Sequence, residues 1–260
     1  MKKITSRENA TFKQLRLLAE SSRERRKQGK TLLDGIHLVS AWFAHFGPPE
    51  LLIVSESGAQ QTEISGFLAQ QRQTLPQVFG DALFREISPV TTPTGILALI
   101  AIPRSSPAAK MSGSCVLLDA IQDAGNLGSI LRSTAAAGIS DIFLGPGCAQ
   151  AWSPRVLRAA MGTHFALRIH EHADLGQVID HFGGISVSTR LDAEASIFDL
   201  DLSGPVAWLF GNEGQGLTLD TAGLTTHAVR IPMPGKAESL NVAAATSICL
   251  FEEIRQKMVN

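Results

Sequence analysis

Near the C-terminus, an irregular loop rich in proline and glycine separates a short apolar stretch from an alanine-rich segment. It reads Ile231-Pro-Met-Pro-Gly-Lys-Ala-Glu-Ser-Leu-Asn-Val-Ala-Ala-Ala245. Its prolines and Gly235 prevent several backbone amides from pairing in a sheet or helix, which leaves these amides available to a ligand. Ser239 and Asn241 stand at the predicted helix start, where side-chain oxygens accept hydrogen bonds from unpaired amides. The segment is typical of a ligand-binding loop.

A second polar segment follows a predicted strand and reads Asp119-Ala-Ile-Gln-Asp-Ala-Gly-Asn-Leu-Gly-Ser-Ile-Leu-Arg132. Asn126 lies at the start, and Arg132 in the second turn, of the predicted helix. Ligands of open α/β sheets bind beyond the carboxyl ends of strands, and a helix N-terminus favours an anionic group such as a phosphate. The dinucleotide fingerprint G-x-G-x-x-G is absent from this segment. Taken alone, it is explained more simply by an asparagine cap and a surface arginine.

The third segment, Leu209-Phe-Gly-Asn-Glu-Gly-Gln-Gly-Leu217, places three glycines directly after a predicted buried strand. Glycine lets the backbone approach a ligand closely and adopt positive φ. A structural turn seldom needs three glycines around a carboxylate. We therefore interpret Glu213 as part of a site rather than of a solvated loop.

Apolar periodicity predicts an alternating α/β protein in two parts. The predicted strands cover 31–33, 51–54, 95–101, 115–118, 142–144, 166–169, 185–188, 206–210 and 229–231. The predicted helices cover a segment capped by Asn9, then 36–46, 127–137, 154–161, 175–182 and 240–257. Pro, Ser, Gly and Ala dominate the stretch before residue 114, which is typical of a linker. We expect domains at 1–103 and 114–260 joined by a linker at 104–113, with a mostly parallel, helix-covered sheet in the second.

Composition indicates an ordinary globular protein with a sizeable core, since 44% of the 260 residues are hydrophobic and 18% are charged. The N-terminus lacks the apolar core of a signal peptide, and no apolar run is long enough to span a bilayer. Cys115, Cys148 and Cys249 are scattered and lack CxxC spacing. These cysteines predict neither a disulfide framework nor a zinc site, and they favour the reducing cytoplasm.

Positive charge is concentrated at the N-terminus. Residues 1–30 hold ten Lys or Arg against three Glu, a balance of +7, so the remaining residues carry −8. The cluster Arg23-Glu-Arg-Arg-Lys27 is either a solvated helix face or an arm that contacts phosphates, because phosphate neutralisation dominates nucleic-acid affinity. Composition alone does not choose between these interpretations.

Together, in this order and spacing, the three polar segments resemble the motifs of the SpoU (TrmH-like) RNA 2′-O-ribose methyltransferases of the SPOUT superfamily. The resemblance covers residues 115–255, and Val156-Leu-Arg-Ala-Ala-Met-Gly162 is similar to the family's segment between its first and second motifs. Residues 4–102, with Asp34-Gly35 and Thr92-Pro-Thr-Gly-Ile-Leu-Ala98, are similar to the substrate-binding domain often fused in front. That domain resembles a small RNA-binding ribosomal-protein fold.

The resemblance implies an S-adenosylmethionine site built from Gly211, Ile231 and Leu240, with neighbouring backbone in Leu209–Gly216 and Pro232–Gly235 holding the adenosine. It also implies a deep trefoil knot, a rare exception to the rule against knots. A homodimer through the C-terminal domain, with the active site across its interface, is implied as well. A candidate dimer surface is the apolar face of the last helix (Val242, Ile248, Leu250, Phe251 and Ile254), although packing in the core explains these residues equally well.

The family resemblance also places Arg132 near the reacting ribose oxygen. There it acts either as a phosphate-assisted base or by stabilising the negative charge that develops on this oxygen. Asn126 and Asn241 orient the ribose or Arg132, while Glu213 and Ser239 fix the guanidinium. Structured RNA is the expected substrate, with ribosomal RNA favoured over transfer RNA.

Two other classes of function stay open. One is a catalytically silent RNA-binding or ribosome-assembly factor, which the full set of polar motif residues disfavours. The other is a Rossmann-type enzyme that binds a nucleotide near Gly125. His170-Glu-His172 lacks a third metal ligand, and no G-x-S-x-G elbow or P-loop is present. We therefore expect no metal site.

Overall fold

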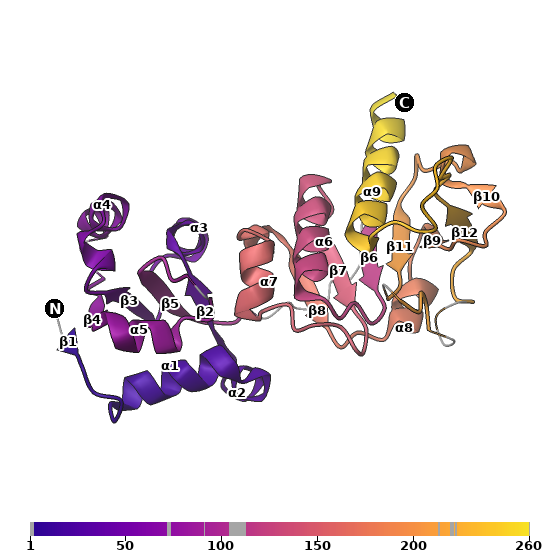
Figure 1. Cartoon of the computed structure of the whole chain (residues 1–260). Coiled ribbons are helices and arrows are strands. Elements are labelled where there is room, and N and C mark those ends of the chain that lie inside the picture. Colours follow the sequence, from indigo (N-terminus) through magenta and orange to yellow (C-terminus); the bar gives the residue numbers. More distant parts are fainter. Residues whose placement is uncertain are drawn as a thin grey trace. The chain divides into compact units, whose positions relative to one another are not determined.

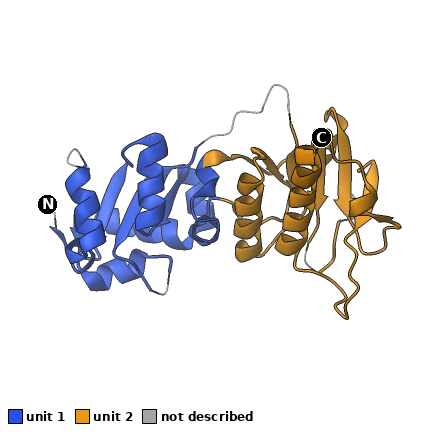
Figure 2. Ribbon diagram, turned by 90° about the horizontal axis from the view of Figure 1, so that it is seen from above, with its two compact units in different colours: residues 1–104, 152–165 blue, residues 105–151, 166–260 orange. Residues whose placement is uncertain are grey.

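The computed structural model describes residues 3–71, 74–90, 92–103, 113–212, 214–218, 221 and 223–259. Two compact units divide the chain (Figure 2). Unit 1 consists of residues 1–104 and 152–165, and unit 2 of residues 105–151 and 166–260. None of the helices in the described ranges combines the length and apolar character that crossing a bilayer requires.

Unit 1 is built on a mixed sheet with the strand order β1-β4-β3-β5-β2. The strands are β1 (Lys3–Ile4), β2 (Lys30–Asp34), β3 (Leu51–Ser55), β4 (Gln77–Phe79) and β5 (Ile96–Ala101). Strand β5 pairs antiparallel with β2 and β3, whereas β4 pairs parallel with β3 and β1. Both faces of the three apolar strands are buried, as their continuous hydrophobic runs predict.

Helices cover this sheet. They are α1 (Ala10–Glu20), α2 (Ser22–Gln28), α3 (Ile36–Phe46), α4 (Thr62–Gln70), α5 (Asp81–Ile87) and α7 (Pro154–Ala159), with the 3₁₀ turns η1 (Gly58–Gln60) and η2 (Thr163–Ala166). The Asn9 side chain caps α1 by accepting hydrogen bonds from the amides of Thr11 and Phe12, as predicted. The apolar stripe of α1, Phe12, Leu15 and Leu18, is fully buried in the core of unit 1.

Residues 152–165 pack in unit 1, although their sequence position places them in the segment expected to form the second domain. The hydroxyl of Thr31 in β2 donates to the Trp152 carbonyl at 2.7 Å. Trp42 of α3 meets Phe165 edge-on, with ring centroids 5.6 Å apart. Unit 1 therefore takes one helix, α7, from the far side of the interdomain linker.

Unit 2 contains a sheet in the order β10-β12-β9-β11-β6-β7-β8, and each of its described pairings is parallel. Its strands are β6 (Cys115–Leu118), β7 (Asp141–Leu144), β8 (Arg168–Glu171), β9 (Ile185–Thr189), β10 (Ala195–Ser196), β11 (Val206–Phe210) and β12 (His227–Arg230). Its helices are α6 (Ala124–Ala136), α8 (Leu175–Asp180) and α9 (Val242–Val259), with the 3₁₀ turn η3 (Ile197–Asp199). Helices α6 and α9 run side by side, and the hydroxyls of Ser133 and Ser247 are 2.8 Å apart (Figure 1).

A buried carboxylate fixes the last helix on this sheet. Glu253 of α9 accepts a hydrogen bond from Trp208 Nε1 of β11 at 2.5 Å and from Lys257 Nζ at 2.6 Å. Its other contact is the Ser114 hydroxyl. Because Trp208 lies in β11 and Ser114 directly precedes β6, these two contacts anchor the C-terminal half of α9 to the centre of the sheet.

The predicted mostly parallel α/β architecture is confirmed. Helix α6 begins at Ala124, earlier than predicted, because Asp123 rather than Asn126 caps it. The strand predicted at 166–169 is wrong by two residues, since 163–166 form a 3₁₀ turn. Helices α2, α4 and α5 and strands β1, β4 and β10 are short and were not predicted individually. The knot stays a prediction.

Candidate active site

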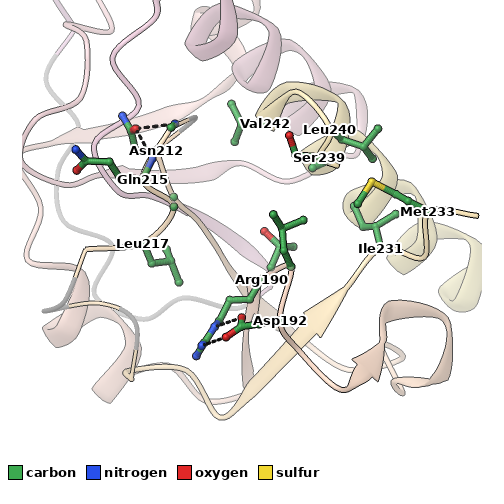
Figure 3. A pocket seen from close by; sticks show the side chains of 16 residues that line it. Arg190, Asp192, Asn212, Gln215, Leu217, Ile231, Met233, Ser239, Leu240 and Val242 are labelled. Atoms are coloured by element: carbon green, nitrogen blue, oxygen red, sulfur yellow. Dashed lines mark hydrogen bonds and ion pairs between the residues drawn. The ribbon is translucent and has the colours of Figure 1, made fainter. Parts of the chain in front are cut away.

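A cavity of about 500 Å³ opens where the adjacent strands β12, β9 and β11 end (Figure 3). Its walls come from four segments at 189–192, 211–217, 231–233 and 239–245. Figure 3 shows Asn212 and Gln215 on one side and Ile231, Ser239 and Leu240 on the other. The carboxyl edge of a parallel sheet is where α/β proteins bind ligands, so the position agrees with the sequence analysis.

The glycine-rich segment after β11 forms a tight hairpin loop. The amide of Asn212 donates to the Gly216 carbonyl at 2.8 Å, and the amide of Gly216 donates back at 2.9 Å. The Asn212 carboxamide oxygen accepts the amides of Gly214 and Gln215 at 2.9 and 3.2 Å. Its nitrogen donates to the Ala120 carbonyl at 2.8 Å. One asparagine thus shapes the loop and ties it to the segment between β6 and α6.

A buried carboxylate at the end of β6 holds the far end of the same loop. Asp119 is 3% exposed and accepts hydrogen bonds from the Thr218 amide at 2.8 Å and the Thr221 hydroxyl at 2.5 Å. Both ends of the loop are therefore attached to the segment that follows β6, which pre-organises the backbone that faces the cavity.

Gly211 is sterically required in this loop. A Cβ at this position would lie 2.5 Å from both the Gly216 carbonyl oxygen and the Leu217 nitrogen, well inside van der Waals contact. Gly216 adopts φ +71°, a left-handed conformation that favours glycine. The glycines thus let the loop fold back on its own backbone along the cavity wall.

The first and third polar segments meet beside the cavity. Asn241 caps α9 by accepting the Ala243 amide at 2.9 Å, and its nitrogen donates to the Asn126 side-chain oxygen at 2.8 Å. Asp123 caps α6 by accepting the Asn126 amide at 2.7 Å, so the Asn126 side chain does not serve as that cap. Two asparagines 115 positions apart in sequence are therefore joined directly.

Most of the residues predicted to bind a cofactor line the cavity. They are Gly211, Gly216, Ile231 and Leu240, and Ser239 lines it too. Leu209 is instead fully buried within β11, and Pro232 lies outside the lining.

The charged catalytic candidates are placed differently. Arg132 is exposed on α6, does not line the cavity, and makes no hydrogen bond or ion pair with the other described residues. Glu213 lies outside the described residues.

Sequence reasoning missed one wall of the cavity, residues 189–192 after β9. In this wall Arg190 forms a two-point ion pair with Asp192 through its Nε and Nη2 atoms at 3.0 and 2.7 Å. Because the strand at 185–188 was predicted, the rule that sites lie beyond strand ends could have identified this wall. Ala245 carried no comparable signal, whereas Gln215 and Met233 lie in the backbone segments that were expected to hold the adenosine.

The His170 side chain of the His170-Glu-His172 segment is held by contacts within unit 2. The His170 ring stacks on Phe143 with centroids 4.5 Å apart, and its Nε2 lies 3.7 Å from Asp141, which also accepts two hydrogen bonds from Arg168. Among the described residues, no group of three or more His, Cys, Asp or Glu side chains could hold a metal ion.

Comparison with known proteins identifies the class. Residues 113–251 match the SpoU rRNA Methylase family, and residues 9–98 match the MRM3-like substrate binding domain. An uncharacterized tRNA/rRNA methyltransferase of Synechocystis is 34% identical, with 98% of this chain and 94% of that protein covered. The 23S rRNA (guanosine(2553)-2′-O)-methyltransferase RlmP of Bacillus subtilis is 31% identical, with 96% and 98% covered.

Solved structures agree with these matches. The crystal structure of an RNA 2′-O ribose methyltransferase has a TM-score of 0.83 at 28% identity, with 98% of this chain and 99% of that chain covered. The methyltransferase AviRb from Streptomyces viridochromogenes, solved with S-adenosylmethionine, has a TM-score of 0.83 at 26% identity, with 97% and 100% covered. The chain therefore belongs to the SpoU rRNA methylase family. It is an RNA methyltransferase, and its methyl donor is S-adenosylmethionine.

Proposed function

We propose that this enzyme methylates a ribose 2′-hydroxyl of ribosomal RNA. The main support is the cavity of about 500 Å³ between the glycine loop and Ser239–Leu240, with the Asn126–Asn241 pair beside it. Relatives that match this chain over nearly all of its length are named as 23S rRNA 2′-O-methyltransferases, one for a guanosine and one for a uridine.

The residues around the cavity fit the adenosine part of S-adenosylmethionine. Gly211 and Gly216 leave backbone rather than side chain at one wall, and Ile231 and Leu240 supply apolar surface for an adenine ring. Backbone next to Leu209 and Pro232 completes the proposed binding segment. S-adenosylmethionine, when bound, supplies an electrophilic methyl group.

The chain's own residues position the RNA and manage the charge that develops on its ribose oxygen. The Asn126–Asn241 pair offers carboxamides that orient the ribose. The Arg132 guanidinium holds the adjacent phosphate and stabilises the developing alkoxide. Across the dimer proposed below, Ser239 and Glu213 of a second copy fix the orientation of that guanidinium.

Mass-spectrometric mapping of ribose methylation in RNA from cells with and without the gene tests this function. We expect one 2′-O-methylated nucleotide of ribosomal RNA to disappear when the gene is deleted. If a 2′-O-methylated nucleotide of transfer RNA disappears instead, transfer RNA is the substrate. Unchanged methylation, together with no calorimetric binding of S-adenosylmethionine, would support a silent RNA-binding or ribosome-assembly factor.

A homodimer through unit 2 completes this proposal. Arg132 follows Asn126 by six residues on α6, which places it about 9 Å further along the helix and about 120° around it. Within one copy the arginine therefore points away from the asparagine pair, which supports an active site completed by a second copy. Of the α9 surface predicted for dimerisation, Leu250 is fully buried whereas Phe251 is 50% exposed.

Replacing Phe251 by glutamate is expected to shift the dimer toward monomer and to reduce methyl transfer in parallel, because a charge would be buried without a partner. Light scattering at micromolar concentration measures the change. Leu17→Glu is the matched control, since Leu17 is similarly exposed (48%) but lies in unit 1. A fully active wild-type monomer would refute the dimer.

Unit 1 is proposed to bind RNA. The basic residues of α2 differ in whether their side chains are free to contact it. Arg25 is buried, and its guanidinium donates to the carbonyl of Leu18 at 2.7 Å at the end of α1. By contrast, Arg23, Arg26 and Lys27 of α2 are exposed and have no ion-pair partner among the described residues. These three cations are therefore the best placed to contact phosphates.

Changing Arg23, Arg26 and Lys27 together to alanine is expected to weaken RNA binding and to make its salt dependence shallower. The slope of log K against log salt is negative. Each lost phosphate contact reduces its magnitude by about 0.7 to 0.9, which amounts to about 2 to 3 for all three contacts. Filter binding of ribosomal RNA at several salt concentrations measures this slope.

The matched control removes the same charge from paired side chains. Arg7, Lys13 and Arg16 are bonded to Glu86, Glu8 and Glu20, respectively. Their triple alanine variant should leave the slope closer to that of the wild type. Equal slopes for both variants would show that the α2 cations only solvate a helix face.

We also infer that the enzyme works in the cytoplasm, where ribosomal RNA is available. The three free cysteines, Cys115, Cys148 and Cys249, support a reducing compartment. Burial raises the pKa of the Cys115 thiol to about 12, so this cysteine is an inert core residue.

A further inference from the structure

A second, smaller cavity lies next to the proposed cofactor site. It has a volume of about 130 Å³ and lies between the β6–α6 segment and the glycine loop. Three of its lining residues, Ala120, Gln122 and Thr218, do not line the larger cavity. The others, Asn212 and Gln215–Leu217, line both cavities. A protein cavity of about 150 Å³ holds one benzene molecule, so this space suits a single aromatic ring.

The polar groups of the small cavity divide into occupied and available ones. The Asn212 carboxamide is bonded to the Gly214 and Gln215 amides and to the Ala120 carbonyl, and Thr218 is bonded to Thr221 and Asp119. The side chains of Gln122 and Gln215 are exposed and have no hydrogen-bond partner among the described residues. Each carries two donors and an acceptor that a ligand can use.

We infer that this cavity receives the base of the nucleotide whose ribose is methylated, and that Gln122 and Gln215 bond its edge. This inference rests on the proposed function. Proteins read unstacked RNA bases through hydrogen bonds to their edges, and carboxamides match the neutral donors and acceptors found there.

Two features favour a base over the amino-acid end of the methyl donor. The donor's end carries an ammonium and a carboxylate, yet none of the described residues that line this cavity is charged. In addition, Gln122 precedes Asn126 by only four residues, with the α6 cap between them. A base held at Gln122 therefore places its ribose near the Asn126–Asn241 pair.

The test compares Gln122→Ala and Gln215→Ala with Gln177→Ala, an exposed glutamine on α8 outside both cavities. Ribosomal RNA from cells lacking the gene serves as methyl acceptor, and calorimetry measures S-adenosylmethionine affinity. We expect KM for RNA to rise at least about fivefold in the first two variants, the lower end for losing a base-edge contact. Because Gln122 lines only the small cavity, its variant should leave the Kd for S-adenosylmethionine unchanged.

Two results would overturn the inference. One is a KM for RNA equal to that of Gln177→Ala; the other is a parallel loss of S-adenosylmethionine affinity in Gln122→Ala, which would assign the cavity to the methyl donor. A wild-type enzyme that binds S-adenosylmethionine but methylates no ribosomal RNA would instead refute the proposed function, so the two failures are distinguishable.

Discussion

Replacing Arg132 by alanine is expected to lower the turnover of methyl transfer by at least about 100-fold, the scale for losing one key electrostatic or proton-transfer group. The affinity for S-adenosylmethionine should change little, because Arg132 does not line the large cavity. Folding should also be preserved, since the side chain is exposed and makes no hydrogen bond with the described residues. Single-turnover transfer with saturating RNA measures the effect.

The Arg132→Lys variant separates charge from geometry. One ammonium keeps the positive charge but cannot reproduce the planar fork that holds phosphate and hydroxyl together, so this variant should also be severely impaired. A lysine variant with wild-type turnover would reduce the role of Arg132 to general charge attraction. Near-wild-type rates for the alanine variant would remove Arg132 from the active site altogether.

The second large effect is expected at Gly211. Its replacement by alanine forces a Cβ against Gly216 and Leu217 and should push the loop away from the cavity. Overpacking of this kind costs about 1 to 3 kcal/mol, so the affinity for S-adenosylmethionine should fall about 5- to 150-fold. Calorimetry measures the affinity, and thermal unfolding shows whether the strain also destabilises unit 2.

Gly214→Ala is the matched control in the same loop. A Cβ there meets only the Asn212 side-chain oxygen, at 3.6 Å, which is ordinary contact. Gly214 also lines the cavity, but its variant adds a methyl group without displacing backbone, so it should lose less affinity for S-adenosylmethionine than Gly211→Ala. If both glycine variants bind equally, the large cavity is not the cofactor site or the loop adapts without cost.

The sequence by itself determined the strongly apolar elements and the chemical character of the site. The bounds of α3, β6 and β11 agree with the prediction, because continuous apolar runs and their flanking polar residues are local properties. The glycine loop was identified for the same reason, since close backbone approach requires glycine itself. Shorter elements such as α2 and β4 lack a long enough period to be recognised.

Only the tertiary structure decided which of these residues meet. The sheet order brings the ends of β9, β11 and β12 together, and this adds the wall at 189–192 to the cavity. The Asn126–Asn241 bond and the transfer of α7 to unit 1 both join segments far apart in the chain. Local periodicity indicates which face of an element is buried, but it does not indicate which other element packs against that face. Strand order and side-chain packing, which settle the partners, are properties of the whole folded chain.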